Sequence, residues 1–129
     1  MRPDSLAEVA RRTLAGDSFD RCLGNFLDQF NLSPEAARVT EEPVLLEPKL
    51  GELGRVQDAY LAATAEELLR RINAPAPVWP AWIERETRKL HRPWFASQLA
   101  VLRAVLLLES PAGFRSRNLF VSENALTRV

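Results

Sequence analysis

The sequence predicts an all-α protein, a compact single-domain bundle of five to seven helices with a proline-rich linker in its middle. At 129 residues, the chain has the length of one ordinary domain and can bury a core without a disulfide or a metal. Apolar residues recur three and four positions apart along most of it, which is helical spacing. The composition, 47% hydrophobic and 26% charged, excludes a disordered or low-complexity chain.

The first predicted helix begins close to the N-terminus. Asp4 and Ser5 are alternative N-caps, and Gly16 supplies the left-handed exit. The apolar residues that share one face of this helix are Leu6, Val9, Ala10 and Leu14.

A second helix is predicted to begin at Asp17 and to end near Asn31. Its helically spaced apolar residues form a stripe rich in aromatic rings: Phe19, Leu23, Phe26, Leu27 and Phe30. Ser33 followed by Pro34 is typical of a cap and a first helical position, so a short helical piece is expected to run to about Val39.

An extended connector is predicted at residues 41–48, because Pro43 and Pro48 each disfavour helical geometry in the residue before them. We expect its apolar residues to be tucked against the core rather than to form a sheet: Val44, Leu45 and Leu46. A long helix then follows from about Lys49 to Asn73. At 1.5 Å per residue it spans roughly 35 Å. Gly51 and Gly54 leave its first turn uncertain.

Residues 74–80, APAPVWP, form the predicted proline-rich linker, in which Trp79 needs an apolar site. A helix is predicted from near Pro80 to a residue before Pro93. Another, from about Gln98 to Glu109, is apolar apart from Arg103, so we expect it to be central to the core. Arg103 is expected to snorkel or to find a buried partner.

Shorter elements are predicted for the rest of the chain. Ser110-Pro111 starts a short helical segment, residues 118–121 are ambiguous, and Ser122 to Leu126 forms a final turn. We expect the second helix and the 98–109 helix to pack against the long middle helix. Phe26 and Leu102 are therefore both predicted to be core residues.

The net charge of zero hides an asymmetry along the single predicted domain, residues 1–129. The acidic half, residues 1–68, has 7 basic and 13 acidic side chains, and the basic half, residues 69–129, has 10 basic and 4 acidic. Two interpretations follow. The basic half attracts phosphate or an acidic partner, or the two halves pack together and neutralise each other.

Several kinds of chemistry are excluded by residue type. One cysteine, Cys22, cannot form an internal disulfide, and with the single histidine, His91, it cannot build a Cys/His zinc site. Phosphate-loop, dinucleotide-binding and zinc-protease motifs are missing from the sequence. We therefore expect no catalytic activity and no cofactor. The remaining catalytic hypothesis pairs Arg85 with His91, in the R-x4-6-H spacing of a family of helical ribonucleases.

Basic residues alternate with aromatic ones between Trp82 and Phe95, a mixture that suits a phosphate backbone and stacked bases. The alternative is that the rings belong to the core and the arginines form a solvated face. The candidate residues for binding a partner or phosphate are Arg85, Arg88, Lys89, Arg92, Arg115 and Arg117.

Residues 114–121 are the expected functional surface. In extended chain, Arg115 and Arg117 point outward together and make a fork that suits carboxylates or phosphates. The competing interpretation is that both bond carbonyl groups at helix ends and hold the C-terminal third together.

Two elements carry a family resemblance: Pro93-Trp94-Phe95, and an SPxxFRxRNxFV element formed by Ser110, Pro111, Phe114, Arg115, Arg117, Asn118, Phe120 and Val121. The sequence resembles a family of small, mostly uncharacterised bacterial proteins. What this resemblance implies is an association: some members are encoded beside a nucleotidyltransferase-like gene, as the small partner of a toxin-antitoxin-style pair is.

The chain is expected to be cytoplasmic. Asp4, Glu8, Arg11 and Arg12 occupy the stretch where a signal peptide needs apolar residues, and the longest nearly apolar run, residues 99–108, is too short for a bilayer. The leading hypothesis is a non-catalytic protein interaction partner, antitoxin-like, with a homo-oligomer left open. The alternatives are a nucleic-acid-binding regulator that uses the basic half and, third, the ribonuclease.

Overall fold

The computed structural model describes residues 1–126 and is helical through most of them. Within this range it has six α-helices, four short 3-10 helices (η1 to η4) and two two-residue strands. The α-helices are α1 (Leu6–Leu14), α2 (Phe19–Leu32), α3 (Glu47–Leu50), α4 (Glu52–Arg71), α5 (Ala100–Glu109) and α6 (Ala112–Arg115). The predicted all-α class is confirmed. The predicted domain extends over residues 127–129, which lie outside the described residues.

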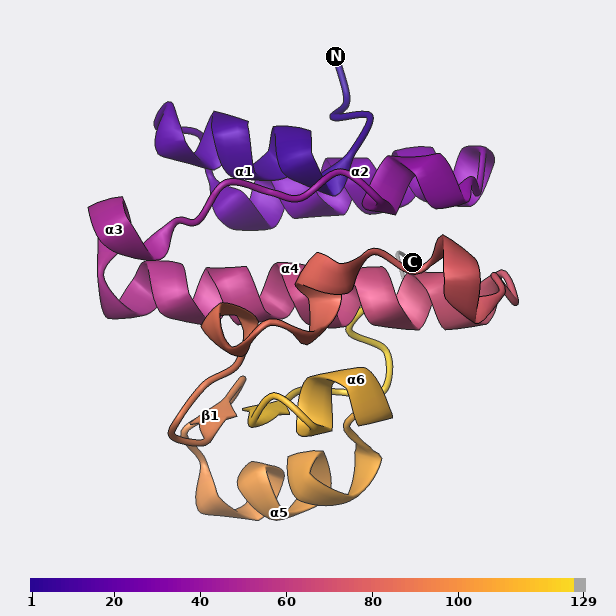
Figure 1. Ribbon diagram of the computed structural model, residues 1–129. Helices are drawn as coiled ribbons and strands as arrows, with labels where there is room; N and C mark the ends of the chain where they lie inside the picture. The colour runs from indigo at the N-terminus through magenta and orange to yellow at the C-terminus, as the bar shows by residue number, and fades with distance from the viewer. Residues whose placement is uncertain (127–129) are drawn as a thin grey trace.

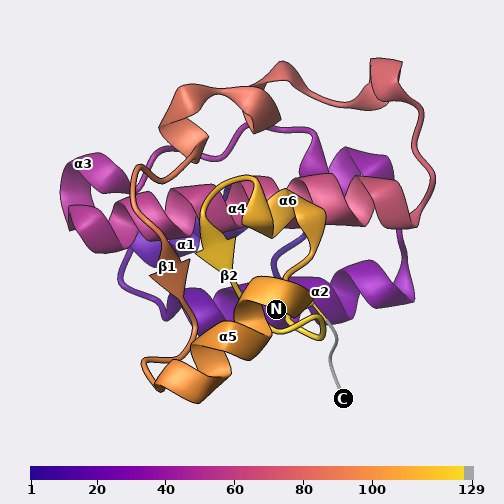
Figure 2. The same ribbon diagram turned by 90° about the horizontal axis from the view of Figure 1, so that it is seen from below.

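Helix α4 is the middle layer of the molecule. Helices α1 and α2 form an antiparallel pair on one side of it, and α5, α6 and the two strands lie on the other side (Figures 1 and 2). Its buried residues include Leu61, Leu68, Leu69 and four alanines, and they surround the helix axis, as expected for a helix covered on both sides. The small alanine side chains let both neighbouring layers approach closely.

The N-terminal hairpin has the Ser5 cap and the apolar faces that the sequence predicts, but α2 begins at Phe19, with Ser18 as its N-cap, rather than at Asp17. Ser5 Oγ accepts a hydrogen bond from Glu8 N (3.1 Å), and Ser18 Oγ accepts one from Arg21 N (3.3 Å). Gly16 has a φ of 111°, the left-handed exit expected after α1. The predicted core residue Phe26 is fully buried. A 3-10 helix, η1 (Ala36–Val39), follows α2 where a short helical piece was expected.

The predicted long helix is divided into α3 and α4. Gly51 lies between them with φ 67° and ψ −140°, a conformation that glycine adopts without steric cost. The predicted connector contains no strand, as expected, but its last two residues, 47–48, belong to α3 instead of extended chain. The connector crosses α4 at Gly54, where an added Cβ would lie 2.4 Å from Leu46 O. Leu46 is fully buried, whereas Val44 is 47% exposed, so the expectation that the connector packs inward holds for Leu46 and not for Val44.

The helix predicted between Pro80 and Pro93 is replaced by two 3-10 helices, η3 (Ala81–Glu84) and η4 (Glu86–Arg88), which follow the linker turn η2 (Ala76–Val78). Arginine side chains donate hydrogen bonds to backbone carbonyl groups of this segment. Arg117 donates to Ile83 O (2.9 Å), and Arg55 donates to Glu86 O (3.2 Å) and Lys89 O (2.6 Å). The prediction failed because these donors come from distant segments.

Two short strands, β1 (Trp94–Phe95) and β2 (Leu119–Phe120), pair in parallel, with Trp94 opposite Leu119 and Phe95 opposite Phe120. The rings of Phe95 and Phe120 stack with their centroids 4.9 Å apart. The sequence left residues 118–121 ambiguous. The pairing with β1 makes Leu119 and Phe120 extended, whereas Asn118 lies in the left-handed region, with a φ of 63°.

Helix α5 is not the centre of the core, and the prediction for Leu102 is wrong: this residue is 43% exposed. The core is built from α1, α2, α4 and residues 82–83 and 114–126, while α5 lies at the edge of the molecule (Figure 1). In the described part of the chain, no helix is long and apolar enough to cross a bilayer.

Candidate functional site

Two of the six predicted binding residues, Arg88 and Arg117, are fully buried. Arg88 is 0% exposed, and its guanidinium lies 5.3 Å from the centre of the Trp82 ring. It donates to Pro43 O, and its Nη1 and Nη2 lie 3.6 Å from Asp58 Oδ1 and 3.2 Å from Glu42 Oε2. Arg88 therefore serves the interior of the fold rather than an external ligand.

Asp58 is the carboxylate that receives Arg88, and it is also fully buried. It accepts hydrogen bonds from Leu46 N (2.8 Å) and Glu47 N (3.2 Å), at the start of α3. Desolvation by burial raises the pKa of Asp58, and the two backbone donors and Arg88 oppose this shift. Asp58 joins α4, the connector and η4.

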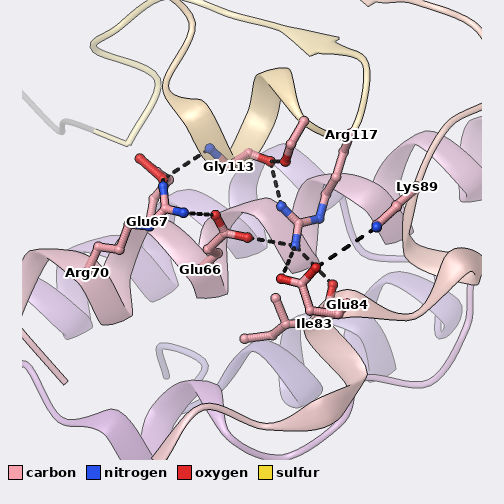
Figure 3. Close-up of polar contacts among 9 residues, drawn as sticks. Glu66, Glu67, Arg70, Ile83, Glu84, Lys89, Gly113 and Arg117 are labelled. Atoms are coloured by element: carbon pink, nitrogen blue, oxygen red, sulfur yellow. Dashed lines mark hydrogen bonds and ion pairs between the residues drawn. The ribbon is translucent and has the colours of Figure 1, made fainter. Parts of the chain in front are cut away.

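Arg117 is the second buried arginine, at 1% exposure. It donates to Gly113 O and Ile83 O, and its Nη2 lies 3.0 Å from Glu66 Oε1 on α4 (Figure 3). Glu66 is itself buried and is paired with Arg70 as well, at 2.6 Å. This cluster fastens the segment after α6 to the central helix.

The predicted outward fork of Arg115 and Arg117 does not exist. Residues 112–115 are helical, and consecutive residues of a helix or tight turn do not alternate sides as those of a strand do. Arg115 is exposed while Arg117 points into the cluster of Figure 3. The competing interpretation, bonds to carbonyl groups that hold the C-terminal third together, is what the structure shows for Arg117.

The other four candidate residues do not join the buried Arg88 and Arg117 in a single basic surface. Arg85 Nη1 lies 2.6 Å from Glu42 Oε1, and Lys89 Nζ lies 3.9 Å from Glu84 Oε2. Arg92 and Arg115 are exposed. Glu42, Asp58 and Glu66 come from the acidic half, and the arginines they pair with, Arg85, Arg88 and Arg117, come from the basic half. The two halves pack together and neutralise each other at these sites.

The residues of the ribonuclease hypothesis have different partners. Arg85 is paired with Glu42, whereas His91 Nε2 lies 3.3 Å from Arg55 Nη2 and His91 Nδ1 lies 3.9 Å from Glu86 Oε1. Cys22 is buried, and desolvation raises the pKa of its thiol, which disfavours the reactive thiolate. Among residues 1–126, no group of three or more His, Cys, Asp or Glu side chains is placed to hold a metal ion.

The apolar surface of α5 is left largely uncovered by the fold. Six large aliphatic side chains on or next to this helix are between 43% and 84% exposed: Leu99, Val101, Leu102, Val105, Leu107 and Leu108. Val101, Ala104, Val105 and Leu108 follow the i, i+3, i+4, i+7 spacing of one helix face, which we call the outer face. Sequence reasoning missed this surface because an apolar run is normally assigned to a core.

The platform beneath α5 fixes its orientation. Leu106 is 7% exposed, and the Arg103 guanidinium lies 5.0 Å from the centre of the Phe95 ring and donates to Gln98 Oε1. Ser110 Oγ accepts from Val121 N (2.7 Å), and its single O–H has two carbonyl acceptors within reach, Leu106 O (2.8 Å) and Val121 O (2.9 Å). These contacts hold one side of α5 against β1 and β2, and the outer face is directed away from the protein.

A groove of about 660 Å³ lies between α2, the first half of α4 and the segments around Trp94 and Val121. Its walls are mainly apolar, from Phe19, Leu23 and Tyr60 among others. No protein-family model, no curated protein and no solved structure matches this chain.

Proposed function

We propose that this protein is a non-catalytic protein-protein interaction partner, and that it binds through the outer face of α5. The observation that carries the proposal is the exposure of Val101 and Leu108, at 73% and 84%, at the two ends of a helix face with no charged residue on it. Contiguous apolar patches of this kind mark interaction sites in proteins that are otherwise well packed.

Burial of the outer face is energetically favourable against a partner surface that is also apolar. Complete burial of a Val or Leu side chain contributes about 1.5–3 kcal/mol, so covering part of six such side chains offsets the entropy cost of association. The outer face has the spacing by which one helix packs against another. The partner surface is therefore expected to be an apolar helix.

The two elements that carry the family resemblance support this surface. Trp94 and Phe95 form β1, the Phe95 ring stacks on Phe120 of β2, and Ser110 Oγ bonds to Leu106 O of α5 and to Val121 N on the same side of the helix. Both elements thus build the platform that presents α5. By the association that the resemblance implies, the proposed partner is the product of a neighbouring nucleotidyltransferase-like gene, and the protein is its antitoxin-like companion.

Co-expression with the neighbouring gene product tests the proposal. The variant V101E/L108E places two carboxylates on the outer face, and L32E is the matched control, because Leu32 is also 73% exposed but lies on α2. We expect the wild type and L32E to copurify with the partner and to suppress its toxicity. The double variant is expected to do neither while keeping the wild-type circular dichroism spectrum and melting temperature.

Two outcomes contradict the proposal. If a complex forms and the double variant retains it, the outer face is not the binding surface. If the wild type forms no complex with any copy or partner and leaves toxicity unchanged, the protein is not an interaction partner of this kind.

A further inference from the structure

The outer face of α5 is complementary to itself. Its residues, Val101, Ala104, Val105 and Leu108, are spaced symmetrically about the midpoint between Ala104 and Val105. We propose that α5 pairs with α5 of a second copy of this chain, antiparallel, about a two-fold axis at this midpoint. The inference rests on the proposed function, since it concerns the same surface and names the second copy as its occupant when the neighbouring gene product is absent.

The symmetric spacing is what an antiparallel pair requires. A two-fold axis between Ala104 and Val105 places Val101 level with Leu108 of the second copy, and Ala104 level with Val105 of the second copy. Each contact therefore occurs twice, and each joins a smaller side chain to a larger one. Ala104 lies next to the axis, where its small side chain allows the two helices to approach closely.

The charges at the ends of α5 favour the antiparallel direction. Glu109 occupies the last turn, where the helix dipole disfavours a carboxylate, and the first turn, AVLR, contains no acidic residue. The N-cap residue is Leu99, whose side chain cannot accept a hydrogen bond from the backbone. Antiparallel pairing brings Glu109 of each copy level with the first turn of the other, so the carboxylate meets the positive end of a helix dipole. Parallel pairing brings the two Glu109 carboxylates together.

The present contacts of Glu109 are compatible with this arrangement. Its Oε1 accepts a long hydrogen bond, 3.4 Å, from the exposed Glu123 N. Leu102 and Leu107, 43% and 46% exposed, lie on either side of the outer face and widen the apolar surface to be covered. The outer face itself contributes no charge that burial would desolvate.

Opposite charges introduced at positions 101 and 108, which face each other in the proposed pair, test both the dimer and the antiparallel direction of its helices. V101K and L108E each place charges against an aliphatic side chain of the second copy, which we expect to raise the dimer dissociation constant at least about 100-fold. In an equimolar mixture, Lys at 101 of one variant is level with Glu at 108 of the other, and the second contact of that pair remains Leu with Val. The mixture is therefore expected to recover association.

Sedimentation velocity of the full chain, alone, over a concentration series up to about 1 mM measures these states. We expect the wild type and the control L32E to reach twice the 14.5 kDa chain mass, V101K and L108E each to stay at the chain mass, and their mixture to return to twice that mass. Recovery by the mixture supports the antiparallel register, because parallel pairing places position 101 against 101.

Each other outcome overturns the inference. A wild-type monomer at every concentration excludes the second copy, and loss of the partner complex in V101E/L108E then leaves the proposed function intact. A dimer that both single variants retain lies on another surface. Single variants that dissociate but do not recover when mixed contradict the antiparallel direction.

Discussion

Asp58 Oδ1 lies 3.6 Å from Arg88 Nη1, and neither residue has any exposed surface. Asp58 also accepts the N–H groups of Leu46 and Glu47, so a single carboxylate connects α4, the start of α3 and η4. Polar groups at the start of α3 and in η4 are thus both paired with the one buried carboxylate of Asp58 on α4. Removal of that charge is expected to affect all three.

Asp58→Asn is expected to lower the free energy of unfolding by about 3 kcal/mol, because breaking one partner out of a buried ion pair leaves the other charge uncompensated. Glu42, 3.2 Å from Arg88, compensates part of the loss. Urea unfolding followed by tryptophan fluorescence measures the change. The exposed pair of Glu41 and Arg11 supplies the control: Glu41→Gln should change stability by less than about 1 kcal/mol. Equal effects of the two substitutions would show that the Asp58 cluster is not a structural centre.

Arg117 and Arg115 form a matched pair two residues apart. Arg117→Ala is expected to cost about 3 kcal/mol of stability, since it removes the buried guanidinium that pairs with Glu66 and the side-chain donor to Ile83 O. Arg115 is exposed, and its replacement by Ala should change stability by less than about 0.5 kcal/mol. Thermal unfolding of the two variants checks this difference, and a similar melting temperature for both would contradict the buried cluster of Figure 3.

Tyr60 is expected to ionise at unusually high pH. Desolvation by burial and the nearby Asp20 carboxylate raise its pKa from 10.0 to about 12, and its ring edge meets the Phe114 ring at 4.9 Å between centroids. Tyr60 is the only tyrosine in the sequence, so tyrosinate absorbance reports on it alone. The native protein should be mostly un-ionised at pH 11, where the urea-unfolded chain is mostly ionised. Equal midpoints in the two states would contradict this environment.

The raised pKa of Tyr60 makes the free energy of unfolding fall at high pH. Below pH 10 both states hold the proton, and between pH 10 and about 12 the unfolded state releases it first. The contribution of Tyr60 is therefore complete below pH 10 and is lost as the pH rises through about 12, by at most about 2.7 kcal/mol. Tyr60→Phe should remove this part of the slope of unfolding free energy against pH.

Gly54→Ala is expected to destabilise the protein although it adds a better helix former. The new Cβ would lie 2.4 Å from Leu46 O and 2.5 Å from Leu46 C, which are backbone atoms that cannot move independently. The gain in helix propensity of about 1 kcal/mol is opposed by an overpacking cost of about 1–3 kcal/mol and a displaced connector. Glu52→Ala, exposed at the start of the same helix, is the control. A stabilised Gly54→Ala would show that the connector is free to move away from α4.

Helical periodicity and caps were enough to predict α1, α2 and most of α4. These elements have apolar stripes or a recognisable N-cap, such as Ser5, that identify a helix independently of its neighbours. The break at Gly51 and the 3-10 helices after Pro80 depend on contacts with distant chain, from Asp58, Arg55 and Arg117. Local patterns contain no information about such contacts.

The candidate site was harder to predict for two physical reasons. A charged residue is normally exposed, yet Arg88 and Arg117 are buried because carboxylates more than 20 residues away in the sequence receive them. Helix α5 is apolar, yet much of it is exposed. Because it has apolar residues on every side, its sequence does not indicate which face packs against the protein. Only the positions of Leu106 and Arg103 against the strands distinguish its inner face from its outer face.

In each buried ion pair, the carboxylate leaves the ribosome before the arginine, because α4 precedes both arginines in the sequence. Asp58 and Glu66 are synthesised well before Arg88 and Arg117, the cations that make their burial possible. Until those arginines emerge, desolvating the carboxylates is unfavourable, and one side of α4 stays hydrated while the α1–α2 hairpin can already pack on the other. We expect nascent chains that end before residue 88 to present this side of α4 to chaperones, and the last stage of folding to await the arrival of Arg117.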